Sequence, residues 1–242
     1  MKKRYKAQKN GSRFRITKKK LFIFLSIAVV VTTFILVSTI STGRASLQQR
    51  ALANVSEARF FMKHAESDTI RVQFFSGIRE ENYRVDGAPS RTVPFALINV
   101  EPKDGSLTTV QELRGTLQLC DQEHEVTLER NQFGRNFGFD LGKAVDCKTE
   151  ISFTLILAND YRVDFELKCA MPEDAISWQE ALHIATEYLA DHIKGVSSFE
   201  TYVKIVTDMA NVGAFWFVQF VTSNNTRHFA IITPDGTIIE RT

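Results

Sequence analysis

The sequence predicts an α+β fold: an N-terminal transmembrane helix, an antiparallel β-sandwich domain, and a small module in which one helix packs on an antiparallel sheet. Three observations predict this. A charge-free apolar run fills residues 21–40, alternating apolar residues dominate residues 69–171, and an amphipathic helix followed by four candidate strands occupies residues 174–242. With 242 residues, the chain is long enough for an anchor and one or two small domains.

The first 20 residues form a basic tail. Ten of the 30 Lys and Arg residues lie in residues 1–20, which contain no Asp or Glu. The rest of the chain therefore contains 20 basic and all 28 acidic residues. A basic tail joined to an acidic body is a segregated charge pattern. Binding to nucleic acid is the alternative use of such a tail. Membrane topology already accounts for the charge, so we expect no nucleic-acid partner.

Residues 21–40 read "LFIFLSIAVVVTTFILVSTI" and predict a transmembrane helix. At about 1.5 Å per residue this run spans about 30 Å, the thickness of the bilayer hydrocarbon. Basic residues flank only its N-terminal end, which predicts a single-pass protein of the cell membrane with a cytoplasmic N-terminus and extracytoplasmic domains. The membrane lipid would contact residues 21–40 and the basic tail. The run exceeds the usual apolar core of a signal peptide, so an uncleaved signal-anchor is favoured over cleavage near "GRAS".

Residues 41–68 predict a helical stalk or linker. Their apolar residues recur near helical spacing, at Leu47, Ala51, Val55, Ala58 and Met62. A dimerising coiled coil is the alternative for this stretch.

Residues 69–171 predict an extracytoplasmic β-sandwich domain. Several short alternating segments separated by turn-forming residues are typical of an antiparallel sandwich. In the last hairpin, the alternation pairs Leu157 with Tyr161, and Pro94 is expected on an edge strand or at a bulge. The candidate strands are residues 70–75, 92–100, 112–120, 124–130, 135–141, 150–158 and 161–169.

The three cysteines are expected at one end of this domain if its later strands run up and down. Strand parity directs Cys147 and Cys169 inward and Cys120 outward. Disulfides form and persist outside the cytoplasm, so a Cys147–Cys169 bond with Cys120 free is favoured. The other two pairings stay open. A catalytic thiol at Cys120 is the functional alternative, although no general base is recognisable around it.

Residues 174–242 predict a helix laid across a small sheet. Ser177 and Glu180 have the spacing of a capping box, and Gly195 suits the C-terminal end of the helix. One helix across an antiparallel sheet closes a core. The strand "AFWFVQFV" is apolar on both faces and is expected at the centre. The candidate strands are residues 201–207, 214–221, 227–233 and 237–241.

The runs "ISWQEALHIATEYL", "FWFVQF" and "HFAIITPDGTII" resemble a PepSY domain, over residues 174–242. The resemblance implies an extracytoplasmic, non-catalytic module. Such modules are associated with restraining peptidases or with regulation of the cell envelope. No catalytic residues belong to the family, so the resemblance implies none in this chain.

The sequence contains no recognisable catalytic, metal or cofactor motif. No two of the five histidines have the spacing of a helical zinc site, and neither a nucleophile elbow nor a glycine-rich phosphate loop is present. We therefore predict no catalytic, metal-binding or cofactor-binding residues, and a protein that is not an enzyme. Two aromatic doublets, Phe60–Phe61 and Phe74–Phe75, are expected to form contacts between domains, or else a patch for a partner.

These features together predict a membrane-anchored binding or regulatory protein of the cell envelope. Its partner would be a protein or peptide outside the membrane, and its role would be to restrain a peptidase or to modulate envelope assembly. An enzyme whose site is assembled from scattered residues is one alternative. A structural assembly subunit is the other.

Overall fold

The computed structural model describes residues 45–239, apart from residues 83, 106, 133, 147–149 and 208–212. The chain divides into two units, and the second unit, Ser46–Thr242, is the one described below. The predicted tail and transmembrane segment lie outside the described residues. Among the residues that are described, no helix combines the length and the apolar character needed to cross a bilayer.

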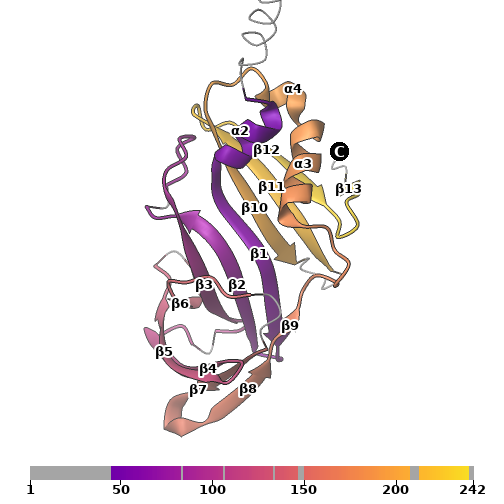
Figure 1. Ribbon diagram of the computed structural model, residues 1–242. Coiled ribbons are helices and arrows are strands. Elements are labelled where there is room, and N and C mark those ends of the chain that lie inside the picture. Colours follow the sequence, from indigo (N-terminus) through magenta and orange to yellow (C-terminus); the bar gives the residue numbers. More distant parts are fainter. Residues whose placement is uncertain are drawn as a thin grey trace, which may run out of the picture. The chain divides into compact units, whose positions relative to one another are not determined.

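The described part is α+β and rich in antiparallel strands, as the sequence predicted (Figure 1). Its helices are α2 (Leu47–Ala53), α3 (Trp178–Tyr188) and α4 (Ala190–Ile193), and a short 3-10 turn covers Ala158–Asp160. Its strands are β1 (Val55–Glu66), β2 (Ile70–Glu80), β3 (Thr92–Pro102), β4 (Glu112–Leu119), β5 (Gln122–Arg130), β6 (Phe137–Asp140), β7 (Ile151–Ile156), β8 (Arg162–Glu166), β9 (Lys168–Cys169), β10 (Phe199–Thr207), β11 (Ala214–Thr222), β12 (Arg227–Ile232) and β13 (Ile238–Ile239).

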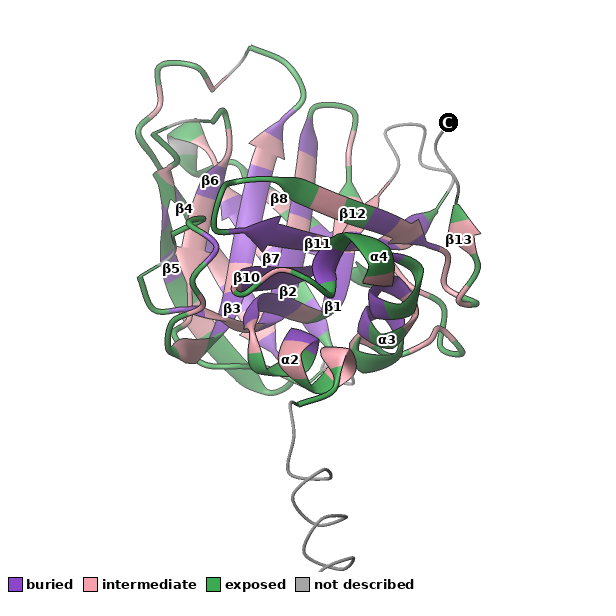
Figure 2. Ribbon diagram, turned by 90° about the horizontal axis from the view of Figure 1, so that it is seen from above, coloured by how far each residue is buried: buried purple, intermediate pink, exposed green. Residues whose placement is uncertain are grey.

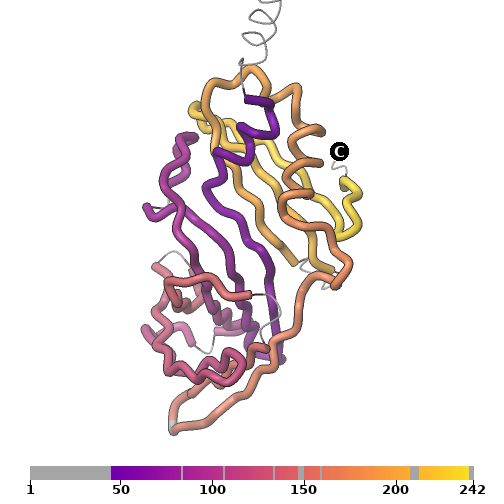
Figure 3. The backbone as a smooth tube through the Cα atoms, viewed as in Figure 1, coloured from indigo at the N-terminus to yellow at the C-terminus, as the bar shows by residue number. Residues whose placement is uncertain are grey.

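All these strands belong to one thirteen-stranded sheet in the order β13-β12-β11-β10-β1-β2-β3-β6-β5-β4-β7-β8, with β9 beside β1. Every neighbouring pair is antiparallel except β1 and β10, which are parallel. Because β9 follows β8 directly and pairs with β1, the sheet from β1 to β8 closes on itself (Figure 3). The strands expected to form a sandwich therefore make one curled sheet with a core between its walls.

The core of this closed sheet is built from alternating strand residues, as the sequence predicted. In the last hairpin, Ile151, Phe153 and Leu155 are buried, and the amide of Leu157 donates to the carbonyl of Tyr161 at 2.8 Å. The predicted register of this hairpin is confirmed. Tyr161, however, is 65% exposed, because it lies at the turn, beyond the closed core.

A second core lies between the helices and strands β10 to β12, where α2 and α3 pack side by side on one face of the sheet (Figure 2). The Ser177 hydroxyl caps α3 by accepting from the amide of Glu180 at 3.2 Å, which is the first of the two bonds of the predicted capping box. Ala181, Leu182 and Ala185 face the sheet and are buried. Strand β11 lies between β10 and β12, which confirms its predicted central place. The predicted helix is interrupted at Leu189, where α3 ends and α4 follows.

The prediction of a helical stalk over residues 41–68 is wrong for most of its length. A helix covers only Leu47–Ala53, and Val55–Glu66 is the strand β1. Strand β1 has partners on both edges, and tertiary pairing of this kind outweighs local helix propensity. Two bulges in β1 break the strict alternation of its buried residues, which is why its apolar spacing resembled that of a helix.

The two cores meet at β1 and β2. Phe74 belongs to the core of the closed sheet and Phe75 to the helix-covered core, since neighbouring side chains on a strand point to opposite faces. Both cores belong to the single unit Ser46–Thr242, so the predicted contact between separate domains stays a prediction. Pro94 lies where β3 pairs with β2 alone, and so occupies an edge position as expected.

Candidate functional site

A fork in the sheet leaves part of the β1 edge without a partner among the described strands. Strand β10 pairs with β1 only as far as Ala58, and β9 begins to pair at Lys63. In this register, residues 59–62 of β1 face neither β10 nor β9 across that edge. The linker from β9 to α3 leaves the edge at this point and passes to the helix side of the sheet (Figure 3).

An apolar groove of about 740 Å³ occupies the fork. It extends from β1 across the linker to the start of α3 and to strands β10 and β11. Lys63 and Glu173 are the only charged residues that line it among the described residues. Its principal apolar walls are Phe60, Met62, Met171, Ile176, Trp178 and Ile205.

A bulge in β1 turns Phe60 into this groove. Arg59 pairs with Gly77 and Phe61 with Ser76, so Phe60 is the extra residue and has no partner in β2. The close approach of the two strands requires glycine at Gly77. A Cβ atom there would overlap the carbonyl oxygen of Ala58 and lie 2.9 Å from its carbonyl carbon. The bulge therefore depends on Gly77 and sets the direction of the Phe60 side chain.

Phe60 is 37% exposed and stacks on Trp178, with 5.8 Å between ring centroids and 20° between ring planes. Trp178 is the first residue of α3, so the cap at Ser177 helps to place the indole ring. In the sequence, Phe60 stands out as half of a doublet, but nothing there predicts its contact with Trp178. No sequence signal joins two residues that are this far apart along the chain.

Hydrogen bonds at both ends hold the linker that walls the groove. The amide of Ala170 donates to the carbonyl of Met62 at 2.9 Å, and the amide of Ile176 donates to the carbonyl of Pro234 at 2.8 Å. The indole nitrogen of buried Trp216 donates to the carbonyl of Ile176 at 3.2 Å. The groove is therefore formed before anything binds in it.

A buried ion cluster fastens β1 to β10 next to the groove. The carboxylate of Glu57 accepts from the Nε atom of Arg59 at 2.8 Å and from the Nζ atom of Lys204 at 2.9 Å. Burial favours the neutral carboxyl group, but the charges and hydrogen bonds of Arg59 and Lys204 outweigh this effect and lower the pKa of Glu57. The guanidinium group of Arg59 also lies over the ring of Phe75, at 4.4 Å.

Of the two cysteines that the structure describes, Cys169 lines the groove and Cys120 does not. Cys120 is exposed, as strand parity predicted, but Cys169 is exposed as well, so its predicted inward direction is wrong. Neither is bonded to another described cysteine. Cys169 pairs with Lys63 in the sheet, and Cys120 lines a small pocket with the same lysine, so both lie at one end of the closed sheet. Cys147 is outside the described residues, so the Cys147–Cys169 bond stays a prediction.

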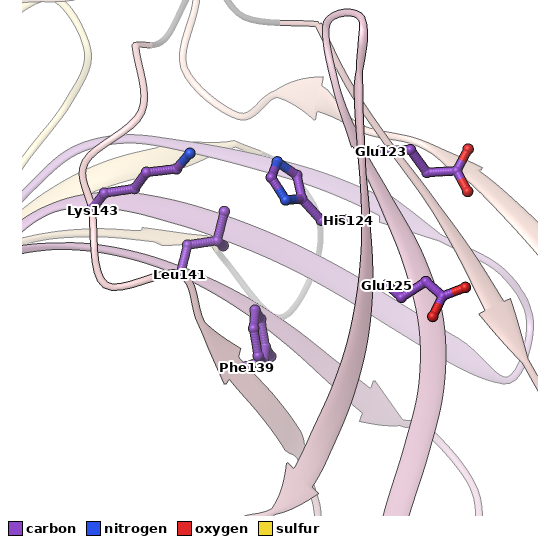
Figure 4. Close-up of a pocket in the computed structure, with 6 residues that line it drawn as sticks. All are labelled: Glu123, His124, Glu125, Phe139, Leu141 and Lys143. Atoms are coloured by element: carbon purple, nitrogen blue, oxygen red, sulfur yellow. The ribbon is translucent and has the colours of Figure 1, made fainter.

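A second pocket, of about 440 Å³, is lined by residues of β5, of β6 and of the segment that follows β6 (Figure 4). His124 and Lys143 point into it beside Phe139 and Leu141, whereas Glu123 points away on the other side of β5. The Nε2 atom of His124 is buried and has no hydrogen-bond partner among the described residues. Neither Glu123 nor Glu125 approaches the imidazole ring in Figure 4.

Within the described ranges, no three His, Cys, Asp or Glu side chains come together in a way that could hold a metal ion. No protein-family model matches the chain, and no curated protein and no solved structure shows significant similarity to it. The resemblance of residues 174–242 to a PepSY domain therefore stays a prediction. Within the described part of residues 174–242, helix α3 packs on the antiparallel strands β10 to β12.

Proposed function

We propose that the chain is a single-pass, membrane-anchored binding protein of the cell envelope, which holds an extended segment of a partner protein in the groove beside β1. The anchor and its orientation rest on the charge and hydropathy of residues 1–40. The binding role rests on one observation, the open edge of β1 inside a preformed apolar groove.

An open strand edge offers backbone groups to an incoming extended chain. Partner peptides are bound in this way by strand addition, in which main-chain hydrogen bonds provide affinity and side-chain pockets provide specificity. Since the carbonyl of Met62 already accepts from Ala170, the open stretch is Arg59–Phe61. At about 3.3 Å per residue it is about 10 Å long, enough for about three residues of a partner strand.

The aromatic pair supplies the apolar part of the binding. A large apolar side chain of the partner would move from water into the space between Phe60, Trp178 and Met171. This burial would contribute about 1.5–3 kcal/mol to the binding free energy. This gain exceeds the contribution of any single backbone hydrogen bond, about 1 kcal/mol. We therefore expect partner segments that carry a large aliphatic or aromatic residue.

The anchor would raise the affinity for partners in the same membrane. The predicted span ends at residue 40 and the folded unit begins at Ser46, so only a short connection joins them. Because the tether is short, the groove stays close to the membrane, and its effective concentration for a partner in the same membrane is high. Modest affinity in the groove is then sufficient for function.

The test uses the full chain in lipid nanodiscs and a displayed library of short random peptides. Selected peptides are expected to protect the backbone amides of Arg59–Phe61 from hydrogen exchange. Phe60→Ala and Trp178→Ala should each weaken peptide binding by about tenfold, the equivalent of about 1.4 kcal/mol. Phe229→Ala is the matched control, because Phe229 is a strand phenylalanine with 44% exposure outside the groove.

Protection confined to other strands, or equal losses of affinity for Phe60→Ala and Phe229→Ala, would exclude the groove as the binding site.

A further inference from the structure

The segment between β2 and β3 crosses the ends of β10 and β11, and its tip lies beside the turn that follows β11 (Figure 3). The contact is between backbones at Gly87, where φ is +76°. A Cβ atom at Gly87 would overlap the amide nitrogen of Ser223 and lie 2.5 Å from the carbonyl carbon of Thr222. Only glycine fits this approach. Arg84–Ser90 is called the strap below.

Side chains, rather than strand pairing, hold the strap in place. Besides one bond within the strap, from the amide of Ala88 to Asp86 Oδ1 at 3.0 Å, its bonds reach residues of β2, of β10 or of the turn just before β10. The bonds are Gly87 N to Glu200 Oε2 at 2.8 Å, Ser198 Oγ to the Gly87 carbonyl at 2.8 Å, Tyr202 Oη to the Arg84 carbonyl at 3.3 Å, and Ser90 N to Glu80 Oε1 at 2.6 Å.

Two of these bonds end on buried carboxyl groups. Glu80 and Glu200 are both buried, and the Oε1 atom of Glu200 has no hydrogen-bond partner among the described residues. A buried carboxylate oxygen without a donor is costly when it carries charge and much less so when it carries a proton. Glu80 has an additional donor, the hydroxyl of Ser56 at 2.9 Å, which leaves Glu200 as the less well satisfied of the two.

The surroundings of Glu200 favour its neutral form. Burial raises the pKa of Glu200, and the negative charges of Glu80 on β2 and Asp86 on the strap act in the same direction. The amide of Gly87 and the hydroxyl of Tyr202 act in the opposite direction, without reversing the shift. The neighbour of Glu200 in register on β11 is Val221, which is uncharged.

We propose that the strap closes over the ends of β10 and β11 while Glu200 is protonated, and that it opens when the Glu200 carboxyl group loses its proton. A proton on Oε1 leaves Oε2 free to accept from Gly87. Loss of that proton places a charge on an oxygen without a donor, close to Glu80 and Asp86. Opening the strap admits water to this charge and uncovers Tyr202. The strap thus acts independently of the groove at β1.

The direction of the pH effect follows from linkage. With the strap open, Glu200 is hydrated and has an ordinary pKa; with the strap closed, its pKa is raised. Closure is therefore favoured at pH values below both pKa values and is lost as the pH rises through the raised one. Each unit by which the two pKa values differ changes the closure equilibrium by up to about tenfold.

The experiment measures hydrogen exchange at the amides of Gly87 and Ser90 in the full chain in nanodiscs, from below pH 4.5, the ordinary pKa of a glutamate, to mildly alkaline pH. Rates are corrected for intrinsic base catalysis. Protection of both amides should fall as the pH rises from 4.5 through the raised pKa of Glu200, by up to about tenfold for each unit that separates the two pKa values. Glu200→Gln, which cannot ionise, should remove this dependence. Glu101→Gln changes an exposed carboxylate on the distant end of β3 and should leave it intact.

A wild-type protein whose strap protection does not vary with pH would overturn the proposal, as would a Glu200→Gln variant with the wild-type profile. Ser198→Ala keeps the test informative if Glu200→Gln does not fold. Removal of the Ser198 hydroxyl should lower protection of Gly87 by a similar factor at every pH. If Ser198→Ala instead abolished the pH dependence, control by Glu200 would be refuted.

Discussion

Replacement of Gly77 by alanine tests whether the bulge in β1 depends on the close approach of two backbones. The new Cβ atom would overlap the carbonyl oxygen of Ala58, lie 2.9 Å from its carbonyl carbon, and lie 3.0 Å from the Cα atom of Arg59. All three atoms belong to the backbone, so no side chain can rotate away. Overpacking typically costs about 1–3 kcal/mol, and we expect Gly77→Ala to reach or exceed the upper value.

Gly138→Ala is the matched control, because Gly138 also lies in a central strand but its nearest contact to a new Cβ atom is the flexible side chain of Leu97, at 3.7 Å. Chemical unfolding of the full chain in detergent measures the free energy of unfolding for both variants. Gly77→Ala should lose at least about 2 kcal/mol more than Gly138→Ala and should also lose affinity for groove-binding peptides. Equal stability of the two variants would refute the reasoning about the bulge.

Two further outcomes follow from the core and from the ion cluster. Phe153→Ala removes a fully buried ring from the closed sheet and should lower the free energy of unfolding by about 3–5 kcal/mol. Tyr161→Ala changes an exposed turn of the same hairpin and should change this free energy by less than about 0.5 kcal/mol. Denaturant titration measures both variants. The pKa of Glu57 is lowered in the folded protein. Its contribution to the free energy of unfolding is therefore complete above the ordinary pKa of 4.5 and is lost as the pH falls through the lowered pKa. Acid unfolding curves should be shallower for Glu57→Gln than for the wild type, and identical slopes would contradict the role given to the cluster.

The elements predicted correctly from sequence are those whose signals are local. The hairpin of β7 and β8 alternates with a period of two, and this period alone pairs Leu157 with Tyr161. The start of α3 is set by the hydroxyl of Ser177 and an amide three residues later. Both signals act over a few residues, so the rest of the chain does not change them.

The elements predicted wrongly depend on distant partners. Residues 55–66 have apolar spacing that fits a helix, yet they form a strand between β2 and β10. The parallel pairing of Val55 with Thr201 joins residues far apart in the chain. No local pattern specifies such a pairing, because the pairing partner decides whether a strand forms.

The groove shows the same division. Phe60 was noticeable in the sequence as part of a doublet. Its neighbours Met171 and Trp178, however, follow it in the sequence only after all the strands of the closed sheet. The glycine that permits the bulge, Gly77, carried no signal of its own. Only the folded sheet places these residues together.

The sequence by itself determined the charge asymmetry, the apolar run at residues 21–40, the inward faces of the later strands and the start of α3, because periodicity and capping act between near neighbours. Tertiary structure alone decided that one sheet serves both cores, that it closes from β8 and β9 back to β1, and that a groove opens where β10 and β9 separate. The physical reason is that strand pairing buries backbone hydrogen bonds between distant segments, and the identity of the partner is settled only when the whole chain folds.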